Sequence, residues 1–373
     1  MSVISVRKLN EYDMRALREA VEAHLNAVTH NGELCAGMRV VLKPNLVTAR
    51  HAENAATTHP LLIRAVCDAL RDRGVSDITI ADSPGGPYVA AALKTVYAVT
   101  GVSKLADVAQ LNYDTGWKRI ETPEAYLCPD FNIINPLLQA DYIINLPKLK
   151  THSLTLLSGS VKNMFGSIPG LQKPELHYRF KDIESFSRML AELCVLTGPR
   201  LTIMDAVDTM EGNGPTGGKR RFLGLTIASR DPFALDWYAA GLMGIESEKI
   251  DMLRIGRDRG FFNPDENTIM GDEPDFDIPP YELPDTAKAE FLNAVPPLIR
   301  KPVTVAARAL VRPLPKLDKS KCCGCGKCAE ICPAKIVRIK NGKAGFTKKN
   351  CISCFCCQEM CPMNAIRVKR RLK

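Results

Sequence analysis

Apolar and polar positions alternate along the chain in blocks that favour helices and strands in turn. Residues 12–28 carry apolar side chains at helical spacing, for example at Leu17 and Val21. Residues 39–43 form a short continuous apolar run, which is typical of a buried strand. Strand and helix patterns that follow one another in this way predict a parallel sheet with crossover helices.

The same patterns continue through most of the chain. They predict further strands over 77–82, 141–146, 201–205 and 222–229. They predict helices over 60–73, 89–99, 182–195, 231–244 and 246–260. Thr58 is the expected N-cap of the first of these helices, and Pro60 lies in its first turn.

The pattern weakens towards the carboxyl end of this region. Residues 264–285 are acidic and rich in proline and predict an irregular connector, while 286–310 are helical in pattern but interrupted by prolines. Residues 312–315 then predict a hinge. We therefore expect an α/β domain over 1–310, with a mostly parallel, Rossmann-like sheet and helices on both faces, and a small domain over 311–373.

The small domain carries a repeated cysteine pattern. The spacing Cys322-x2-Cys325-x2-Cys328-x3-Cys332-Pro333 returns as Cys351-x2-Cys354-x2-Cys357-x3-Cys361-Pro362. This is the spacing of a bacterial-type two-cluster ferredoxin, in which the fourth cysteine of each run ligates the other cluster. It predicts two 4Fe–4S clusters, one held by Cys322, Cys325, Cys328 and Cys361, the other by Cys351, Cys354, Cys357 and Cys332.

A zinc site or a disulfide framework is the alternative interpretation of these cysteines. Zinc sites usually combine C-x2-C pairs with histidine, and this domain has no histidine. Disulfide frameworks belong to secreted chains, and the first residues do not resemble a signal peptide. Cys323 and Cys356 are surplus to the pattern. We expect them to pack beside a cluster, with a vicinal disulfide or a redox role as the alternatives.

Charge is distributed unevenly along the chain. Residues 316–373 hold 15 Lys or Arg and 3 Asp or Glu, whereas the whole chain has a formal net charge of +9. Two oxidised clusters with their thiolates would cancel about four of these positive charges. The remaining basic surface suits an acidic electron donor or acceptor protein of the ferredoxin or flavodoxin type. Nucleic-acid binding is not expected, because no aromatic side chains interleave with the basic ones.

The overall composition is that of a soluble globular protein, with 46% hydrophobic and 24% charged residues. No run of about eighteen apolar residues is present, so no membrane span is expected. Together with cluster-bearing thiols, these features predict a reducing cytoplasm, in an anaerobic or microaerobic cell.

Polar residues cluster where the predicted strands end. In open α/β sheets, ligands bind outside the carboxyl ends of the strands. If the strands are parallel, these polar residues line one crevice: Lys43, Asn45, Asp82, Ser83, Lys148, Lys150, His152 and Asp205. Lys162 and Asn163 follow soon after, among glycines at a possible helix start. So many lysines around one crevice predict an anionic ligand, such as a carboxylate or a phosphate.

Other residues are better explained by structure than by function. The loops at Gly85–Gly86 and 212–218 match no nucleotide-binding motif. Among the histidines, His59 is expected to cap a helix and His24 and His30 to lie at the surface, which leaves His152 and His177 as candidates for function. The scattered cysteines are expected to be buried: Cys35, Cys67, Cys128 and Cys194.

Several of these segments together resemble a known family. They are VLKPNLV, TTHP, ADSPGG, INLPKLKTHSLTLLSGSVKNMFGSIPG and IMDAVDTMEGNGPTGG. The chain resembles, over about 35–260, the bacterial and archaeal family catalogued as domain of unknown function 362, whose members often carry a C-terminal 4Fe–4S module. The resemblance implies an architecture and a site more than a reaction.

A looser similarity, at the level of the fold, is to the amino-terminal domain of lactate racemases that use a nickel pincer nucleotide. Those enzymes hold their cofactor through a lysine and several histidines. The segment from Lys148 to His152 is suggestive, but the match is not residue by residue. Nickel is therefore not carried over to this chain.

Three functions remain open at this point. The first is an iron–sulfur oxidoreductase, in which two clusters pass single electrons to an anionic substrate. Lys43, Lys148, Lys150 and Lys162 would bind it, Asn45 and Asn163 would orient it, and His152 or Asp205 would transfer a proton. The second is an electron-delivery or maturation protein that activates a partner or its metal or corrinoid cofactor. The third is a redox sensor.

Overall fold

The computed structural model describes residues 2–272, 274, 277–286 and 313–369. The expected helical segment over 286–310 therefore lies outside the described residues, apart from Thr286, and the boundary at residue 310 stays a prediction. Within the described part of the chain, no helix is both long enough and apolar enough to cross a membrane.

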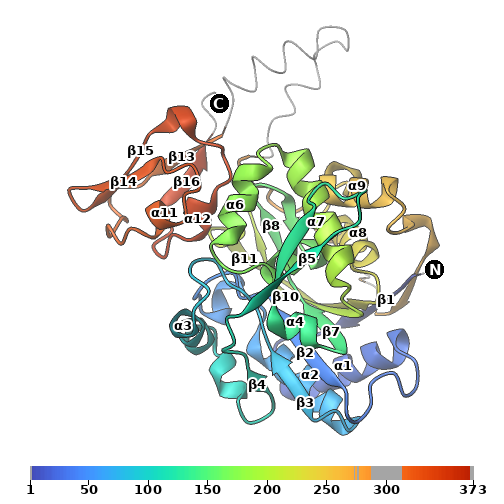
Figure 1. Ribbon diagram of the computed structural model, residues 1–373. Coiled ribbons are helices and arrows are strands. Elements are labelled where there is room, and N and C mark those ends of the chain that lie inside the picture. Colours follow the sequence, from blue (N-terminus) through green and yellow to red (C-terminus); the bar gives the residue numbers. More distant parts are fainter. Residues whose placement is uncertain (1, 273, 275–276, 287–312, 370–373) are drawn as a thin grey trace.

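One mixed sheet forms the centre of the α/β domain, and the described residues contribute ten strands to it (Figure 1). Eight strands follow the order β12, β1, β11, β10, β7, β2, β3, β4, while β8 and β9 extend the sheet beside β10. Their bounds are β1 Ser2–Lys8, β2 Arg39–Pro44, β3 Asp77–Ile80, β4 Gln110–Leu111, β7 Tyr142–Leu146, β8 Lys148–His152, β9 Leu156–Ser158, β10 Leu201–Glu211, β11 Lys219–Ser229 and β12 Asn267–Gly271. A separate hairpin pairs β5 Trp117–Glu121 with β6 Asp130–Ile134.

The sheet is mostly parallel, as the sequence predicts. Strands β10, β7, β2, β3 and β4 run parallel to one another, whereas β11 is antiparallel to both of its neighbours, β10 and β1. The carboxyl ends of β10, β7, β2 and β3 therefore share one edge of the sheet, which is where ligands bind in such folds.

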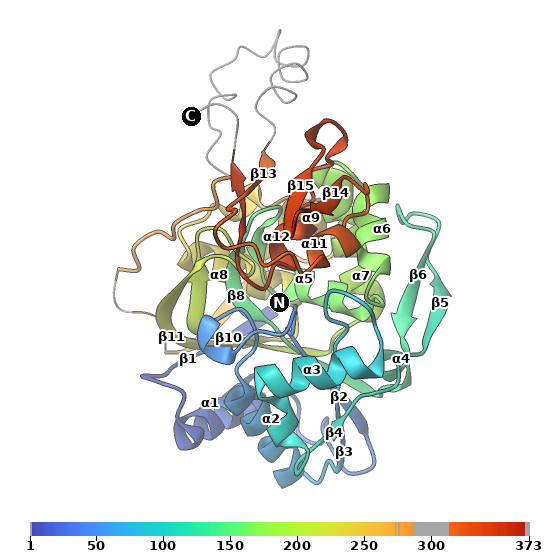
Figure 2. The ribbon, with the colours of Figure 1, turned by 90° about the vertical axis from the view of Figure 1, so that its left-hand side faces the viewer.

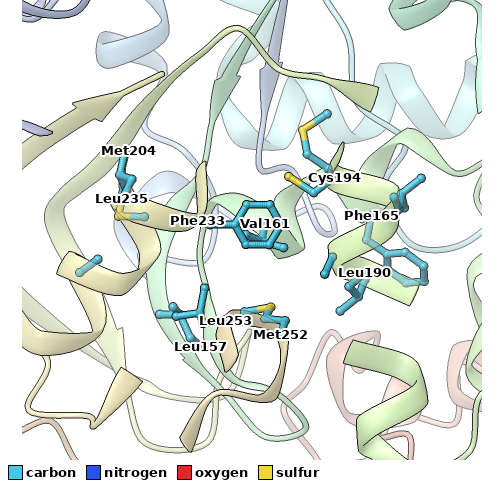
Figure 3. Close-up of a cluster of buried hydrophobic side chains, with 14 of the residues drawn as sticks. Leu157, Val161, Phe165, Leu190, Cys194, Met204, Phe233, Leu235, Met252 and Leu253 are labelled. Carbon is cyan, nitrogen blue, oxygen red and sulfur yellow. The ribbon is translucent and has the colours of Figure 1, made fainter. Parts of the chain in front are cut away.

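Helices cover both faces of this sheet (Figure 2). One face packs against α1 Met14–Val28, α2 Pro60–Asp72 and α3 Ala90–Thr100. The other packs against α7 Ile183–Thr197, α8 Pro232–Leu242 and α9 Asp251–Asp258, and Figure 3 shows part of that core. Shorter helices are α4 Asn135–Gln139, α5 Ser160–Asn163 and α6 Gln172–Arg179.

Short polar residues set where several helices begin. Asp13, Asp182 and Asp231 each accept a backbone N–H in the first turn of α1, α7 and α8. A side-chain oxygen at this position satisfies a donor that the helix itself leaves unpaired. Thr58 is not the N-cap of α2, because His59 occupies that position, and the expectation that His59 caps a helix is confirmed. Thr58 instead accepts the Asn45 N–H through its hydroxyl oxygen, which donates to a carbonyl of β7.

The carboxyl-terminal module (red in Figure 1) is small and built on two antiparallel pairs of strands. Strand β13 Leu314–Leu317 pairs with β16 Ile366–Lys369, and β14 Val337–Lys340 pairs with β15 Lys343–Phe346. Two single-turn helices, α11 Lys327–Glu330 and α12 Cys356–Glu359, lie in the two cysteine repeats. Its core is formed largely by the cysteines themselves with Ile336, Val337 and Ile366.

The strands at one end of the sheet were not anticipated. β1 lies before the first predicted helix, and β12 lies within the segment expected to be irregular. Neither strand has a long apolar run that would predict it from sequence. β1 pairs with β11, and β12 pairs with β1. Strand β10 also continues to Glu211, so that the glycine-rich segment turns only over 212–218 before β11 begins.

Two predictions of side-chain exposure are wrong. His24, expected at the surface, is fully buried beneath β1 and β11. Its Nδ1 lies 2.9 Å from Ser5 Oγ and its Nε2 2.9 Å from Thr226 Oγ1. Cys35, expected to be buried, is exposed. Helical spacing places His24 on the buried face of α1, and this periodic signal outweighs the polarity of one residue.

Replacing His24 should make the stability of the protein less dependent on pH. Burial and the nearby Arg7 lower its pKa from 6.5 to about 3. A depressed histidine pKa means that the unfolded chain binds more protons below pH 6.5, so stability falls as the pH falls. Between pH 8 and pH 5.5 this group alone costs about 1.4 kcal/mol. The shift of the thermal midpoint between these two pH values should be smaller in His24→Gln than in the native protein.

His30, which is exposed, supplies the matched control for this measurement. His30→Gln should keep the full pH dependence of the native protein. An equal pH dependence in His24→Gln and the native protein would contradict the buried, neutral imidazole.

Candidate active site between the sheet and the cysteine-rich module

An ion pair between Lys43 and Asp82 lies buried at the shared strand edge. Lys43 Nζ donates to Asp82 Oδ1 at 2.8 Å, and Asp82 Oδ2 accepts the Leu46 N–H at 2.9 Å. A Cβ atom on Gly166 would lie 2.1 Å from Asp82 Oδ1, so this glycine leaves the space that the pair needs. Because a buried charge is stable only when it is paired, the pair fixes the ends of β2 and β3 relative to each other.

A second buried ion pair joins Lys148 to Asp205. Lys148 Nζ lies 2.9 Å from Asp205 Oδ2 and donates to Tyr12 Oη at 2.7 Å. Tyr12 Oη donates in turn to Asp205 Oδ1, and its ring stacks on His59 at 3.7 Å. Burial lowers the pKa of Lys148 and raises that of Tyr12, while Asp205 acts against the change at Lys148. All polar atoms of the pair are engaged, so these residues form a closed network.

Lys150 begins a chain of amide side chains along the same edge. Its Nζ donates to Asn45 Oδ1 at 2.7 Å and to the Ala56 carbonyl. Asn45 Nδ2 donates to Asn163 Oδ1 at 2.8 Å, and Asn163 Nδ2 donates to Asn145 Oδ1 at 2.7 Å. Burial, followed by repulsion from neighbouring lysines, lowers the pKa of Lys150 to about 7. None of its hydrogen-bond acceptors carries a negative charge.

A cavity of about 90 Å³ lies between this edge of the sheet and the cysteine-rich module. From the α/β domain it is lined by Asn45, Val47, Asp82, Ser83, Gly85, Lys162, Asn163, Phe165, Gly166, Gly170, Lys173, Pro174 and His177. From the module it is lined by Ile331, Cys356, Glu359 and Met360. We call it the interface cavity. Its size suits several water molecules or a small ligand.

Lys162 presents an ammonium group to this cavity. Among the described residues no hydrogen bond or ion pair holds its Nζ, which lies 5.8 Å from the centre of the Phe165 ring. Burial lowers the pKa of Lys162, and Glu359 acts in the opposite direction. An ammonium group that is partly buried and lacks a hydrogen-bonded partner is well suited to bind an anion.

Lys173 is a second cation of the cavity, and sequence reasoning missed it. Its Nζ donates to the Ser83 carbonyl, to Ser83 Oγ at 3.1 Å and to the Pro84 carbonyl at 3.3 Å. Burial lowers its pKa to about 7. Lys173 lies on α6 and does not follow a strand in the sequence. A search for polar residues at strand ends therefore does not find it.

His152 faces the module through Glu359. The Nδ1 atom of His152 accepts the N–H groups of Leu154 and Thr155, which places the ring proton on Nε2. Nε2 lies 3.2 Å from Glu359 Oε1, in a geometry outside that of a regular hydrogen bond, and burial lowers the histidine pKa to about 4. Burial opposes ionisation of Glu359, but His152 and Lys162 outweigh it and lower the pKa of that carboxyl to about 2. At neutral pH the pair is therefore a neutral imidazole and a carboxylate.

His177, on α6, contributes an aromatic ring to the lining of the cavity. Its ring stacks on Phe186 at 4.2 Å and meets Phe165 edge to face at 5.7 Å. Burial lowers its pKa to about 3, so the imidazole is neutral at physiological pH.

The module is attached to this edge by contacts from its second cysteine repeat. Arg50 of the α/β domain donates to the carbonyls of Cys361 and Pro362. A Cβ atom on Gly85 would lie 2.4 Å from Met360 Sδ, so the side chain of Met360 packs directly on that turn. The interface cavity thus depends on both parts of the chain.

The eight cysteines of the repeated pattern fall into two groups in space. Cys322, Cys325, Cys328 and Cys361 line one cavity, which we call the far group. Cys332, Cys351, Cys354 and Cys357 line another, which we call the near group. This is the partition expected from the spacing. The four cysteines of each group are a donor set that suits a 4Fe–4S cluster.

The surplus cysteines differ in their surroundings. Cys323 is exposed and lines the cavity of the far group. Cys356 is buried and lines both the cavity of the near group and the interface cavity.

The strand-end residues proposed from sequence are thus brought together only in part. Asn45, Asp82, Ser83, Lys162 and Asn163 line the interface cavity. Lys43 and Lys150 are absent from the lining but donate hydrogen bonds to two residues that belong to it, Asp82 and Asn45. Lys148, Asp205 and His152 are absent from its lining, which corrects the expectation of a single crevice. The reason is that Lys148 and Asp205 are enclosed by Tyr12, while Glu359 stands between His152 and the cavity.

The amino-acid sequence is similar to those of two known proteins. A 255-residue stretch is 29% identical to the thylakoid-associated protein sll1697 of Synechocystis sp., covering 66% of this chain and 76% of that protein. A 28-residue stretch is 46% identical to Ferredoxin-2 of Desulfomicrobium norvegicum, covering 8% of this chain and 48% of that ferredoxin.

Two solved structures are similar at 12% identity. The lactate racemase apoprotein from Thermoanaerobacterium thermosaccharolyticum has a TM-score of 0.42, with 66% of this chain and 58% of that chain covered. A protein from Thermotoga maritima has a TM-score of 0.34, with 53% and 51% covered. This chain thus spans little more than half of either structure.

Two family models match the chain. The model described as a 4Fe-4S binding domain matches residues 315–338, so the module is of the ferredoxin type and holds a 4Fe–4S cluster in an electron-transfer role. The model described as Domain of unknown function (DUF362) matches residues 40–241, which is more than half of the chain. The protein belongs to the DUF362 family and carries a ferredoxin-type iron–sulfur module at its carboxyl end.

Proposed function

We propose that the protein is an iron–sulfur oxidoreductase that passes single electrons from its module to a small anionic substrate in the interface cavity. The observation that carries the proposal is the lining of this cavity. Lys162 and Lys173 provide cationic groups from the α/β domain, and Cys356 provides a direct neighbour of the near cysteine group. A ligand in the cavity would therefore lie beside both an anion-binding group and a source of electrons.

The near and far groups are each proposed to hold one 4Fe–4S cluster. The lining of each cavity includes the four cysteines that a two-cluster ferredoxin would use for one cluster. When bound, such clusters supply single electrons at potentials set by hydrogen bonds and solvent exposure.

The side chains of the cavity have separate roles in this proposal. Lys162 binds the anionic group, because its ammonium lacks a hydrogen-bonded partner among the described residues. Asn45 and Asn163 orient the ligand, since their amides are fixed by hydrogen bonds to one another. His152 reaches the cavity only through Glu359, so any proton that it exchanges passes that carboxylate. Asp205 takes no part in proton transfer, because Lys148 and Tyr12 occupy its oxygens.

The far group supports electron exchange with a partner protein. Cys323 and Cys325 are exposed there, and so are Lys321 and Lys327. A cysteine cavity that reaches the surface among lysines suits a small acidic electron carrier of the ferredoxin or flavodoxin type. The same face is what the second candidate function requires, namely delivery of electrons to a partner protein or its metal or corrinoid cofactor.

The proposed function predicts which fraction of a cell extract accepts electrons. The protein is purified without oxygen and reduced, and its EPR signal is followed after addition of the small-molecule fraction or the protein fraction. Reoxidation by the small-molecule fraction is expected, and Lys162→Gln should slow it about tenfold or more by removing a charge that binds the substrate. The matched control is Lys104→Gln, which alters an exposed lysine on the α/β domain and should have no effect.

Reoxidation by the protein fraction alone would contradict the oxidoreductase proposal and favour electron delivery. Equal rates for Lys162→Gln and the native protein would contradict the assigned binding group.

Anion binding in the cavity should weaken as the pH rises. The pKa values of Lys150 and Lys173 are lowered to about 7 by burial, so each loses its proton between pH 6 and pH 8. An anion binds the protonated form, and if one of these protons is required the affinity falls about tenfold over this range. Sulfate is a suitable probe because its charge is constant there, and calorimetric titration at pH 6, 7 and 8 measures its affinity. Affinity that is constant or rises with pH would refute this electrostatic account.

Charge reversal at the far group should slow electron entry. Lys321→Glu and Lys327→Glu are expected to lower the rate of reduction by an acidic flavodoxin about tenfold at low ionic strength, because they remove electrostatic steering. The difference should shrink as salt is added. Lys104→Glu is the control for an equal change of net charge. Stopped-flow absorbance of the iron–sulfur chromophore gives the rates, and rates that are equal in all variants would exclude this docking face.

A further inference from the structure

Three ionisable side chains of the interface cavity have no regular hydrogen bond among the described residues. They are Lys162 on α5, His177 on α6 and Glu359 on α12. The ring of His177 is 5% exposed, and Glu359 Oε1 lies enclosed near His152, outside regular hydrogen-bond geometry. Buried polar groups are normally paired within a protein, so three open groups around one cavity indicate a ligand.

The other charged groups of the lining are already used by the protein. Asp82 accepts a hydrogen bond at each carboxylate oxygen, one from Lys43 and one from the Leu46 N–H. Lys173 donates to the carbonyls of Ser83 and Pro84 and to Ser83 Oγ. Within the lining, Lys162 and Glu359 thus remain as the cation and the carboxylate that are available to a ligand.

Lys162 and Glu359 carry opposite charges and line the same cavity, yet no ion pair joins these two described residues. Each attracts the other, because the carboxylate raises the pKa of Lys162 against the larger effect of burial. A space between two such groups suits a ligand that can contact both of them.

Contacts with the surrounding protein fix these groups without using their polar atoms. Asp236 accepts two backbone N–H groups at the start of α5, at 2.6 and 2.9 Å. The ring of His177 stacks on Phe186. Thr216 donates to the backbone carbonyl of Glu359 at 3.1 Å. The side chains therefore extend from anchored segments, which lowers the entropic cost of binding a ligand.

The two charged groups make different demands on a ligand. An ammonium group only donates hydrogen bonds, and an ionised carboxylate only accepts them. An anion without a hydrogen to donate would bind Lys162 but would meet repulsion from Glu359. An anion that also carries a donor hydrogen satisfies both groups. A site built in this way rejects an analogue that lacks the donor, because a buried acceptor is then left unpaired.

We propose that the interface cavity binds a small anion that carries its own O–H or N–H donor. Its charged oxygen binds Lys162, and its donor hydrogen binds the carboxylate of Glu359. Burial lowers the pKa of His177 to about 3, so its neutral ring can donate through one nitrogen and accept through the other. This inference rests on the proposed function, because it defines the class of substrate for the same cavity.

Two probes of nearly equal shape test the requirement for a donor. At pH 6 methylphosphonate and methanesulfonate each carry one negative charge, but only methylphosphonate retains a hydroxyl hydrogen. Calorimetric titration of the complete protein, purified without oxygen, should show that methylphosphonate binds about tenfold more tightly or better. Lys162→Gln should weaken the binding of both anions, since both contact that ammonium group.

The two cysteine repeats supply a matched pair of variants. Glu359→Gln removes the carboxylate charge and should reduce the preference, chiefly because methanesulfonate then binds more tightly. Glu330 stands 29 residues earlier, at the equivalent position of the first repeat, and is exposed. Glu330→Gln should keep the full preference. The EPR spectrum of each reduced variant shows whether its module is intact.

The outcomes separate this inference from the proposed function. Equal affinities of the native protein for the two anions, or tighter binding of methanesulfonate, would overturn the requirement for a donor and leave the anion site standing. An undiminished preference in Glu359→Gln would overturn the role of that carboxylate. Binding of neither anion would remove the anion site itself, and with it the proposed function.

Discussion

Buried ammonium groups need negative charge close to them, and this requirement organises the edge of the sheet. Lys43 and Lys148 are each paired with an aspartate of the same domain. Lys150 and Lys173 have only uncharged hydrogen-bond acceptors, and Lys162 has none among the described residues. Glu359 from the module brings one carboxylate to this region. The balance is positive when these lysines are protonated, and this is the basis for proposing that the cavity binds a further anion.

The same constraint links the two parts of the chain. Glu359 reaches His152 and the interface cavity from helix α12, which begins at Cys356 beside the near group. Thr216 donates its hydroxyl to the Glu359 carbonyl at 3.1 Å and helps to hold the helix in place. The contact that supplies negative charge to the cavity therefore also brings the near group to its wall. In the proposed function, binding of an anion and delivery of an electron depend on one interface.

Sequence alone predicted the parts of this arrangement that depend on local pattern. The carboxyl ends of β2, β3 and β7 could be found because short apolar runs end abruptly in polar residues, and parallel strands bring such ends together. The cysteine partition could be found because its spacing is specific. Tyr12 could not be assigned to Asp205, because 193 residues separate them. For the same reason, nothing in the sequence showed that Glu359 would stand in front of His152, or that Lys173 would turn towards Ser83.

In the proposed function, one of two iron–sulfur clusters shares a wall with a cavity that binds an anion. Crystals of the protein, grown without oxygen and measured at the iron absorption edge, test it most directly. Two separate peaks of anomalous scattering are expected, one among the cysteines of each group, with the second beside Cys356 and the interface cavity. A single peak at the far group, or a second peak away from Cys356, would contradict it.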